Sequence, residues 1–146
     1  MINTDHNYLK FWRVIRYWIK AKHKIGTPEI DMILFLYSEE YFNKTKFKEY
    51  EELMSWDIKR FDLMLRDGWI HVWRKGSGKH TTLYELSYKG KRVANTIYKK
   101  LNGEEIGESP NINPLFRSDA SYMDKVYRKS IKEMNSFIKQ QRYLSQ

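Results

Sequence analysis

Few residues of this chain have the types and spacing that catalysis or metal binding requires. Cysteine is absent, which rules out disulfides, thiolate zinc sites and thiol-based redox sensing. Gly76 and Gly78 lie too close together for a nucleotide-binding loop, and no serine or aspartate sits in a recognisable nucleophile motif. No metal-ligand spacing joins the scattered histidines, which are His6, His23, His71 and His80. The sequence therefore predicts a protein that is not an enzyme and that uses neither a cofactor nor a metal.

The residues best suited to binding chemistry are basic and lie at 74–80. This segment, RKGSGKH, combines positive charge with glycines that favour a turn. Its basic members are Arg74, Lys75, Lys79 and His80. Such a tip fits insertion along a phosphate backbone or into a minor groove. Solvated surface hairpins also carry lysine and glycine, so the interpretation depends on what precedes the tip.

A helix is predicted over 55–66, directly before this segment. Ser55 is a suitable N-cap, and Ile58, Phe61 and Leu65 recur at helical spacing and are expected to face a core, with Met64 beside them. Asp67 and Gly68 end the helix, with Gly68 suited to the left-handed C-terminal position. The residues expected to face a partner from this helix are Ser55, Trp56, Lys59 and Arg60.

Extended segments flank the basic turn. Residues 69–73 have high strand propensity, and residues 81–86 alternate well enough for a return strand. Ser87 is expected to cap a further helix that ends near Leu101. The order of helix, strand, turn, strand and helix indicates a winged helix-turn-helix core over 27–101.

Three more helices are expected before residue 55, within the single domain predicted for 1–146. Apolar residues at spacings of three and four predict a helix over 8–24, and Thr27, Pro28 and Glu29 begin the next, over 28–40. Residues 42–44 are interpreted as a turn, and Thr45 as the cap of a short helix over 46–53. Lysines near its start are expected to contact a nucleic-acid backbone; they are Lys44, Lys46 and Lys48.

The C-terminal part combines a loop with a long helix. Residues 102–118 include a segment rich in glycine and proline and are predicted to be a connecting loop, whereas 119–143 is predicted to be a helix. A helix of this length is long for packing on one small domain, so 8–24 and 119–143 are interpreted as dimerisation helices. The alternative is a helix that folds back over its own domain. The predicted dimerisation residues are Phe11, Trp12, Ile15, Trp18, Val126, Tyr127, Met134 and Phe137.

Charge favours a polyanionic partner. The net charge of the 146 residues is +9, and neutralising phosphates releases condensed counterions. No apolar run approaches the roughly 20 residues that span a bilayer, and the N-terminus lacks the layout of a signal peptide. The sequence therefore predicts a cytoplasmic protein that binds double-stranded DNA and does not insert into a membrane.

The predicted order of elements resembles the MarR type of winged helix-turn-helix protein. The resemblance is carried by Thr27-Pro28-Glu29, by residues 65–70 (LRDGWI) and by residues 86–90 (LSYKG); the PadR type carries similar motifs. It implies a homodimeric transcriptional regulator that places helix 55–66 in the major groove and the wing near the minor groove. Such a protein often responds to a small-molecule effector, which the sequence does not identify.

Two other functions stay open. Asp57 and Asp62 lie on the predicted recognition helix, and acidic groups facing phosphate weaken binding. They favour a winged-helix module that binds a protein instead of specific DNA. A basic peripheral membrane protein using helix 8–24 is the third reading, and the breadth of that helix's apolar stripe argues against it.

Overall fold

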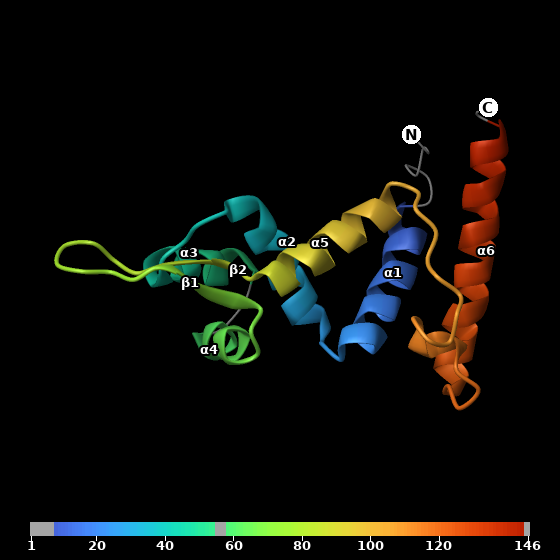
Figure 1. Cartoon of the computed structure of the whole chain (residues 1–146), viewed down its shortest axis with the longest axis horizontal. Helices are drawn as coiled ribbons and strands as arrows, with labels where there is room; N and C mark the ends of the chain where they lie inside the picture. The colour runs from blue at the N-terminus through green and yellow to red at the C-terminus, as the bar shows by residue number, and fades with distance from the viewer. Residues whose placement is uncertain (1–7, 55–57, 145–146) are drawn as a thin grey trace. The chain divides into compact units, whose positions relative to one another are not determined.

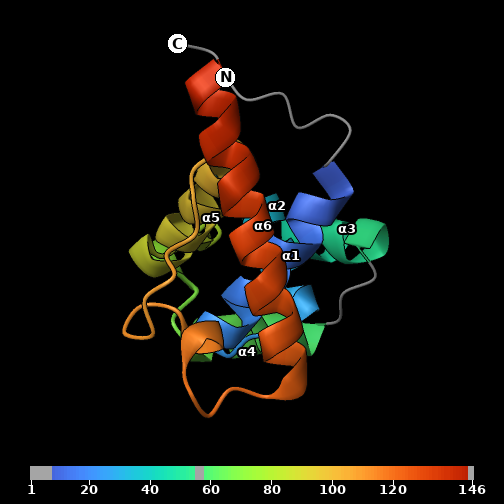
Figure 2. The ribbon, with the colours of Figure 1, turned by 90° about the vertical axis from the view of Figure 1, so that its right-hand side faces the viewer.

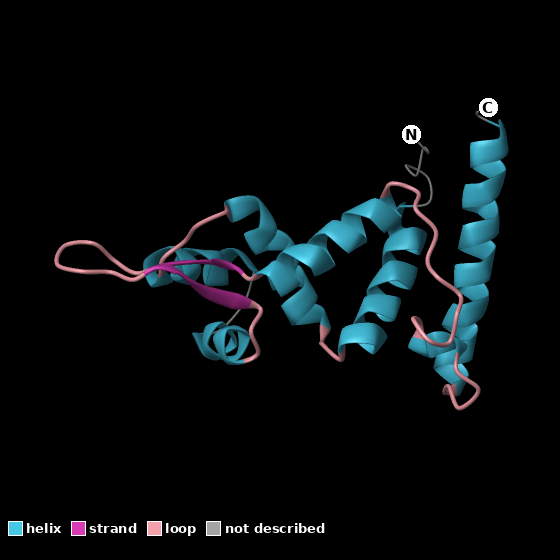
Figure 3. Cartoon of the chain, in the orientation of Figure 1, coloured by secondary structure: helices cyan, strands magenta, loops and turns pink. Residues whose placement is uncertain are grey.

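The computed structural model describes residues 8–54 and 58–144, and this part of the chain is mainly helical with one small antiparallel hairpin (Figures 1 and 3). That class is the one the sequence predicts. The elements are α1 (Tyr8–His23), α2 (Thr27–Glu39), α3 (Lys44–Met54), α4 (Ile58–Arg66), β1 (Ile70–Arg74), β2 (Leu83–Leu86), α5 (Tyr88–Leu101), the 3-10 turn η1 (Pro114–Phe116) and α6 (Tyr122–Leu144).

The chain forms two compact units. The central unit is Thr27–Asn95, and the flanking unit combines the residues before it with the residues from Thr96 onward. The boundary at 95–96 falls inside α5, so this helix begins in the central unit and ends in the flanking unit.

An aromatic cluster forms the centre of the central unit. Phe47 packs edge-on against Phe61 with ring centroids 4.9 Å apart, and Phe61 packs in the same way against Tyr84, also at 4.9 Å. Phe61 and Met64 of α4 are buried, whereas Leu65 is only partly covered. Phe61 and Met64 therefore face the core of the central unit as expected, and Leu65 lies at the edge of that face.

The hairpin is antiparallel and gains a third, short segment. Ile70 pairs with Leu86 and Val72 with Tyr84, with an irregularity between Val72 and Arg74. Phe42 and Tyr84 exchange both backbone hydrogen bonds, at 3.0 and 2.7 Å. The prediction of a simple turn at 42–44 is therefore wrong at Phe42, because this residue is held at the edge of β2.

Caps fix where the helices begin and end. The Lys46 amide donates to Asn43 Oδ1 at 2.8 Å, so Asn43 caps α3 and the prediction of Thr45 as its cap is wrong. The predicted cap of α5 is confirmed, since the Gly90 amide donates to Ser87 Oγ at 3.2 Å. Gly68 has φ +78°, which confirms the left-handed end of α4.

In the flanking unit, α1 packs against α6 (Figure 2). Phe11 contacts Phe137 edge-on with centroids 5.7 Å apart, and Tyr17 stacks on Tyr127 at 3.8 Å. Ile15 and Ile131 are fully buried. The two long helices thus cover much of each other's apolar surface within one chain.

The segment between α5 and α6 is held by buried asparagines. Asn135 of α6 accepts from the Ile106 amide at 2.9 Å and donates to the Ile106 carbonyl at 2.8 Å. Asn113 caps η1 by accepting from the Leu115 amide at 3.0 Å, and it donates to the Gly107 carbonyl at 2.8 Å. The connecting segment therefore carries a 3-10 turn and packs on α6, which begins at Tyr122 and not at 119.

Candidate nucleic-acid interface

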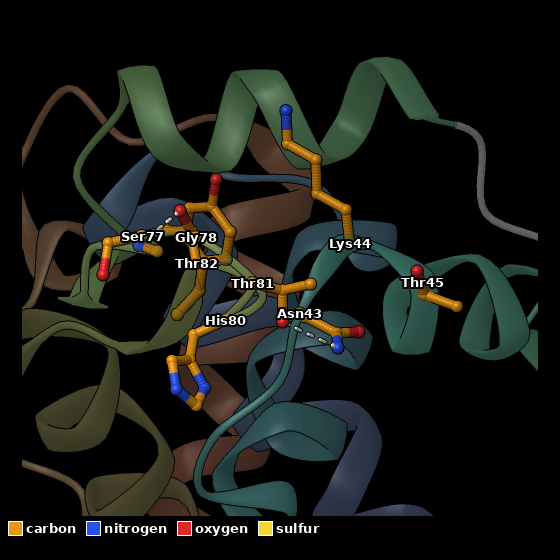
Figure 4. A pocket seen from close by; sticks show the side chains of 10 residues that line it. Asn43, Lys44, Thr45, Ser77, Gly78, His80, Thr81 and Thr82 are labelled. Carbon is orange, nitrogen blue, oxygen red and sulfur yellow. Dashed lines mark hydrogen bonds between the residues drawn. The ribbon is translucent and has the colours of Figure 1, made fainter.

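A hollow of about 480 Å³ lies between the start of α3 and the loop that joins β1 to β2 (Figure 4). Amide, hydroxyl and cationic side chains dominate its walls. The lining residues are Asn43, Lys44, Thr45, Gly76, Ser77, Gly78, His80, Thr81, Thr82 and Tyr84. In Figure 4 the Lys44 side chain extends toward α4, and His80 lies on the other side of the hollow.

A tight turn shapes the wing side of this hollow. The His80 amide donates to the Ser77 carbonyl at 3.0 Å, and Gly78 has φ +58°. Gly76 runs so close to the backbone of His80 and Thr82 that a side chain there would collide with both. The Gly76 amide also donates to Thr82 Oγ1 at 3.0 Å. These contacts hold the tip of the wing (residues 75–80) in one conformation.

The other side is the first turn of α3. Asn43 donates from Nδ2 to Thr81 Oγ1 at 3.4 Å and so connects the cap of α3 to the wing. Lys44 Nζ lies 5.7 Å from the centre of the Phe61 ring. The amides at a helix N-terminus attract anions. With Lys44 and His80 beside them, the hollow has the polarity that suits a phosphate oxygen.

Several residues predicted to bind DNA are exposed on the central unit, and only two of them line the hollow. Lys44 and His80 line it, whereas the others lie around it or elsewhere. The exposed members of the predicted set are Lys44, Lys46, Lys48, Lys59, Arg74, Lys75, Lys79 and His80. Ser55 and Trp56, together with Asp57, lie outside the residues that the structure describes.

Two predicted cations have acidic partners. Arg60 Nη1 lies 3.2 Å from Glu29 Oε1, and both side chains are about a third exposed. Lys46 Nζ lies 3.2 Å from Glu49 Oε2 on the surface of α3. Arg60 is therefore partly neutralised by α2, and a phosphate would have to compete with Glu29 for it.

Residues missed by the sequence reasoning contribute most of the hollow. Asn43, Thr81 and Thr82 supply an amide and two hydroxyls that no basic-residue search would find. The available signal was the pair of threonines directly after the glycine turn, since hydroxyl groups commonly contact phosphates.

Charge is distributed unequally between the two units. In the sequence, residues 27–95 hold 12 Lys and Arg against 11 Asp and Glu, whereas the rest holds 15 against 7. The central unit thus has a net charge of +1 and the flanking unit of +8. Any attraction of the central unit for phosphate depends on where its cations lie, because its overall charge is nearly balanced.

The predicted dimerisation residues are largely used inside the flanking unit. Phe11, Ile15, Trp18 and Met134 are buried within the chain. Val126 is 40% exposed, and Trp12, Tyr127 and Phe137 are partly covered. A contact with a second copy would therefore use the outer surfaces of α1 and α6 and not the apolar faces that join them.

Among the described residues of the central unit, two ionisable groups have shifted pKa values. A hydrogen bond from His71, at 2.8 Å, holds the pKa of Glu85 below its ordinary value, and Lys91 at 3.2 Å acts in the same direction. Burial and a hydrogen bond to Glu39 raise the pKa of Tyr50 to about 12. Both contacts are internal to the central unit and support its frame.

Comparisons with known proteins give no relative: no family model, no curated protein and no solved structure matches the chain. Within residues 8–54 and 58–144, no helix has the length and apolar character needed to cross a bilayer. In the same residues, no three His, Asp or Glu side chains gather closely enough to hold a metal ion.

Proposed function

We propose that this protein is a DNA-binding transcriptional regulator of the winged helix-turn-helix kind, acting as a homodimer. The hollow between Asn43 and the wing turn is the observation that carries the proposal. Amide, hydroxyl and cationic groups line it together, and groups of these kinds position a protein on a phosphate backbone.

The helices and the wing have separate tasks in this proposal. α3 and α4 form the helix-turn-helix, with Lys59 on the exposed surface of α4. The helix enters the major groove, and Lys75 and Lys79 approach the backbone or the adjacent minor groove. A dimer would place two such units on half-sites one helical turn apart.

Fluorescence anisotropy with a random duplex of about 25 base pairs, at two salt concentrations, tests the proposal. We expect affinity to fall steeply with salt, and Lys79→Gln to weaken binding and lower the salt slope by about 1. Arg92→Gln is the matched control, because Arg92 is an exposed cation on α5 outside both the wing tip and the hollow. The proposal is wrong if no binding occurs at low salt or if both variants lose the same affinity.

Selection of bound fragments from a genomic DNA pool then tests specificity. A two-fold symmetric sequence is expected, since a homodimer reads two copies of one half-site. Light scattering at micromolar concentration tests the dimer separately, and a monomer there contradicts that part of the proposal.

A protein partner is the second candidate function, and the exposed apolar residues of the central unit favour it. Leu53 at the end of α3 is 75% exposed and Leu63 of α4 is 39% exposed. Asp62 is exposed on α4 as well. A surface of this composition suits a basic, partly apolar protein surface. Asp62→Asn separates the two functions: it strengthens binding to DNA under the first and weakens binding to a protein under the second.

A further inference from the structure

A second hollow, of about 410 Å³, lies in the flanking unit between the end of α1 and the segment that contains η1. Three of its lining side chains are cations, and none is a carboxylate. The lining residues are Ala21, Lys22, Lys24, Asn111, Ile112, Pro114 and Arg117. Positive charge therefore converges there without an acidic group in the wall to offset it.

Local backbone geometry positions two of the three cations, Lys24 and Arg117. Lys24 directly follows α1 and has φ +54°, a conformation that few residues other than glycine adopt. On the opposite side, Arg128 donates to the carbonyls of Leu115 and Arg117, both at 2.7 Å. Arg128 thus anchors the turn that carries Arg117, and the buried cap Asn113 holds the same turn from within.

Three carboxylates of the flanking unit have partners outside this hollow. Glu104 pairs with Lys100, and Glu105 with Lys139 and Arg142. Asp124 accepts from the Tyr17 hydroxyl at 2.7 Å in an adjoining hollow that also contains Lys20 and Lys24. Within residues 8–54 and 58–144, Lys24 and Arg117 have no carboxylate within ion-pair distance.

We propose that this hollow binds a phosphoryl group. The guanidinium of Arg117 can donate hydrogen bonds to two oxygens of such a group, and the ammonium groups of Lys22 and Lys24 add positive charge that balances the phosphoryl oxygens. Asn111 adds an amide, and Ile112 and Pro114 form an apolar wall against which an organic part of the ligand packs. A multiply charged phosphoryl group fits better than a single carboxylate, because three cationic residues line the hollow, with the Lys22 ammonium 5.1 Å from the Trp18 ring centre.

The site is independent of the wing. It belongs wholly to the flanking unit, which carries a net charge of +8 and so attracts anions at long range. The phosphoryl group comes either from a small phosphorylated compound or from a nucleic-acid backbone, and both share the same recognition chemistry.

Titration of the full chain with pyrophosphate, followed by amide NMR shifts at constant ionic strength, tests the site. We expect saturable shifts at Lys24, Asn111 and Arg117. The Lys24→Gln/Arg117→Gln variant is expected to bind at least about tenfold more weakly. The matched control is Lys10→Gln/Arg13→Gln, which removes the same charges from exposed positions of α1 outside the hollow.

Two results overturn the proposal: shifts that do not saturate, or equal weakening in the two double variants. Thermal unfolding confirms that each variant is folded, and all four substituted side chains are exposed, so the fold should persist.

Competition with a short DNA duplex distinguishes the two sources of the phosphoryl group. Displacement of pyrophosphate by the duplex assigns the site to nucleic acid, and pyrophosphate binding that the duplex leaves unchanged assigns it to a small ligand. Lys79→Gln tests DNA binding by the wing alone. If that variant binds DNA normally, the proposed phosphoryl site in the flanking unit is unaffected.

Discussion

The hydroxyl of Tyr17 donates a 2.7 Å hydrogen bond to Asp124 Oδ1, which joins α1 to the first turn of α6. The Tyr17 ring also stacks on Tyr127, one turn further along α6. One side chain therefore makes a polar and an aromatic contact across the same helix pair. This pair is the frame of the flanking unit, and its strength can be measured.

Tyr17→Phe keeps the stacked ring and removes the hydrogen bond, so we expect a loss of about 1 kcal/mol in the free energy of unfolding. Burial and the bond to Asp124 raise the pKa of Tyr17 to about 12. Because the folded pKa lies above the unfolded value of about 10, the contribution is complete below pH 10 and is lost as pH rises through about 12. Urea unfolding should show that the difference in the free energy of unfolding between the unsubstituted chain and Tyr17→Phe is smaller at pH 11 than at pH 8. Tyr122→Phe, at a tyrosine 79% exposed, is the control.

Glu85→Gln is expected to destabilise the hairpin in a pH-dependent way. The hydrogen bond from His71, followed by that from Lys91, lowers the pKa of Glu85. The resulting stability is present above the unfolded pKa of about 4.3 and is lost as pH falls through the lower folded value. We expect Glu85→Gln to lower the free energy of unfolding by roughly 1–2 kcal/mol at pH 7 and by less at pH 3. Glu52→Gln, at an exposed position of α3, should change the free energy of unfolding little at either pH. A loss for Glu85→Gln that is the same at pH 7 and pH 3 would contradict the prediction.

Asn135→Ala should strongly destabilise the flanking unit. Asn135 is 1% exposed and bonds to both backbone groups of Ile106. Removing its amide leaves a buried donor and a buried acceptor without partners, at a cost of about 2–4 kcal/mol. Chemical unfolding measures the loss, and hydrogen exchange at the Ile106 amide should accelerate. A cost no larger than that of Ser136→Ala, at an exposed neighbour, would contradict this assignment.

Gly76→Ala tests the wing turn. The added methyl group would meet the backbone of Thr82, 2.7 Å from its amide nitrogen, and that of His80. The turn must therefore open, and we expect DNA affinity to fall by about tenfold or more while the helices stay intact. NMR shifts of residues 77–82 report the change in the turn, and anisotropy reports the affinity. Asn95→Ala, at an exposed position of α5 outside the hollow, should leave both nearly unchanged.

Periodicity was sufficient for the main elements. The spacing of Phe11, Ile15 and Trp18 predicts α1, and the strand propensity of Ile70 and Val72 predicts β1. Each of these signals is local, because it depends on residues a few positions apart. The turn at Gly68 and the cap at Ser87 were predictable for the same reason.

Features that depend on distant partners were not predictable. Phe42 reads as part of a turn, and only its pairing with Tyr84 makes it a sheet edge. Asn43 and Thr45 are both good caps, and the chain uses Asn43, which also bonds to Thr81. The segment 102–118 looks like a linker because the side chain that holds it, Asn135, lies 29 residues beyond Ile106.

Positive charge in the sequence predicted part of the candidate site, and the hollow in the folded chain showed the rest. Lys44 and His80 were predicted from the sequence and also line the hollow. Asn43 and the threonines line it because the fold brings the wing next to the start of α3. Basic residues alone could not show which cations already have acidic partners, as Arg60 does with Glu29.

The order in which the ribosome makes the two units follows from the placement of the central unit between the parts of the flanking unit. α1 is synthesised before the whole central unit, and α6 is synthesised after it. Until α6 emerges, the apolar face of α1 that includes Phe11 lacks the Phe137 ring that later covers it. A nascent chain halted after α5 would therefore expose an apolar N-terminal helix to chaperones and to other nascent chains, and the emergence of α6 ends that exposure.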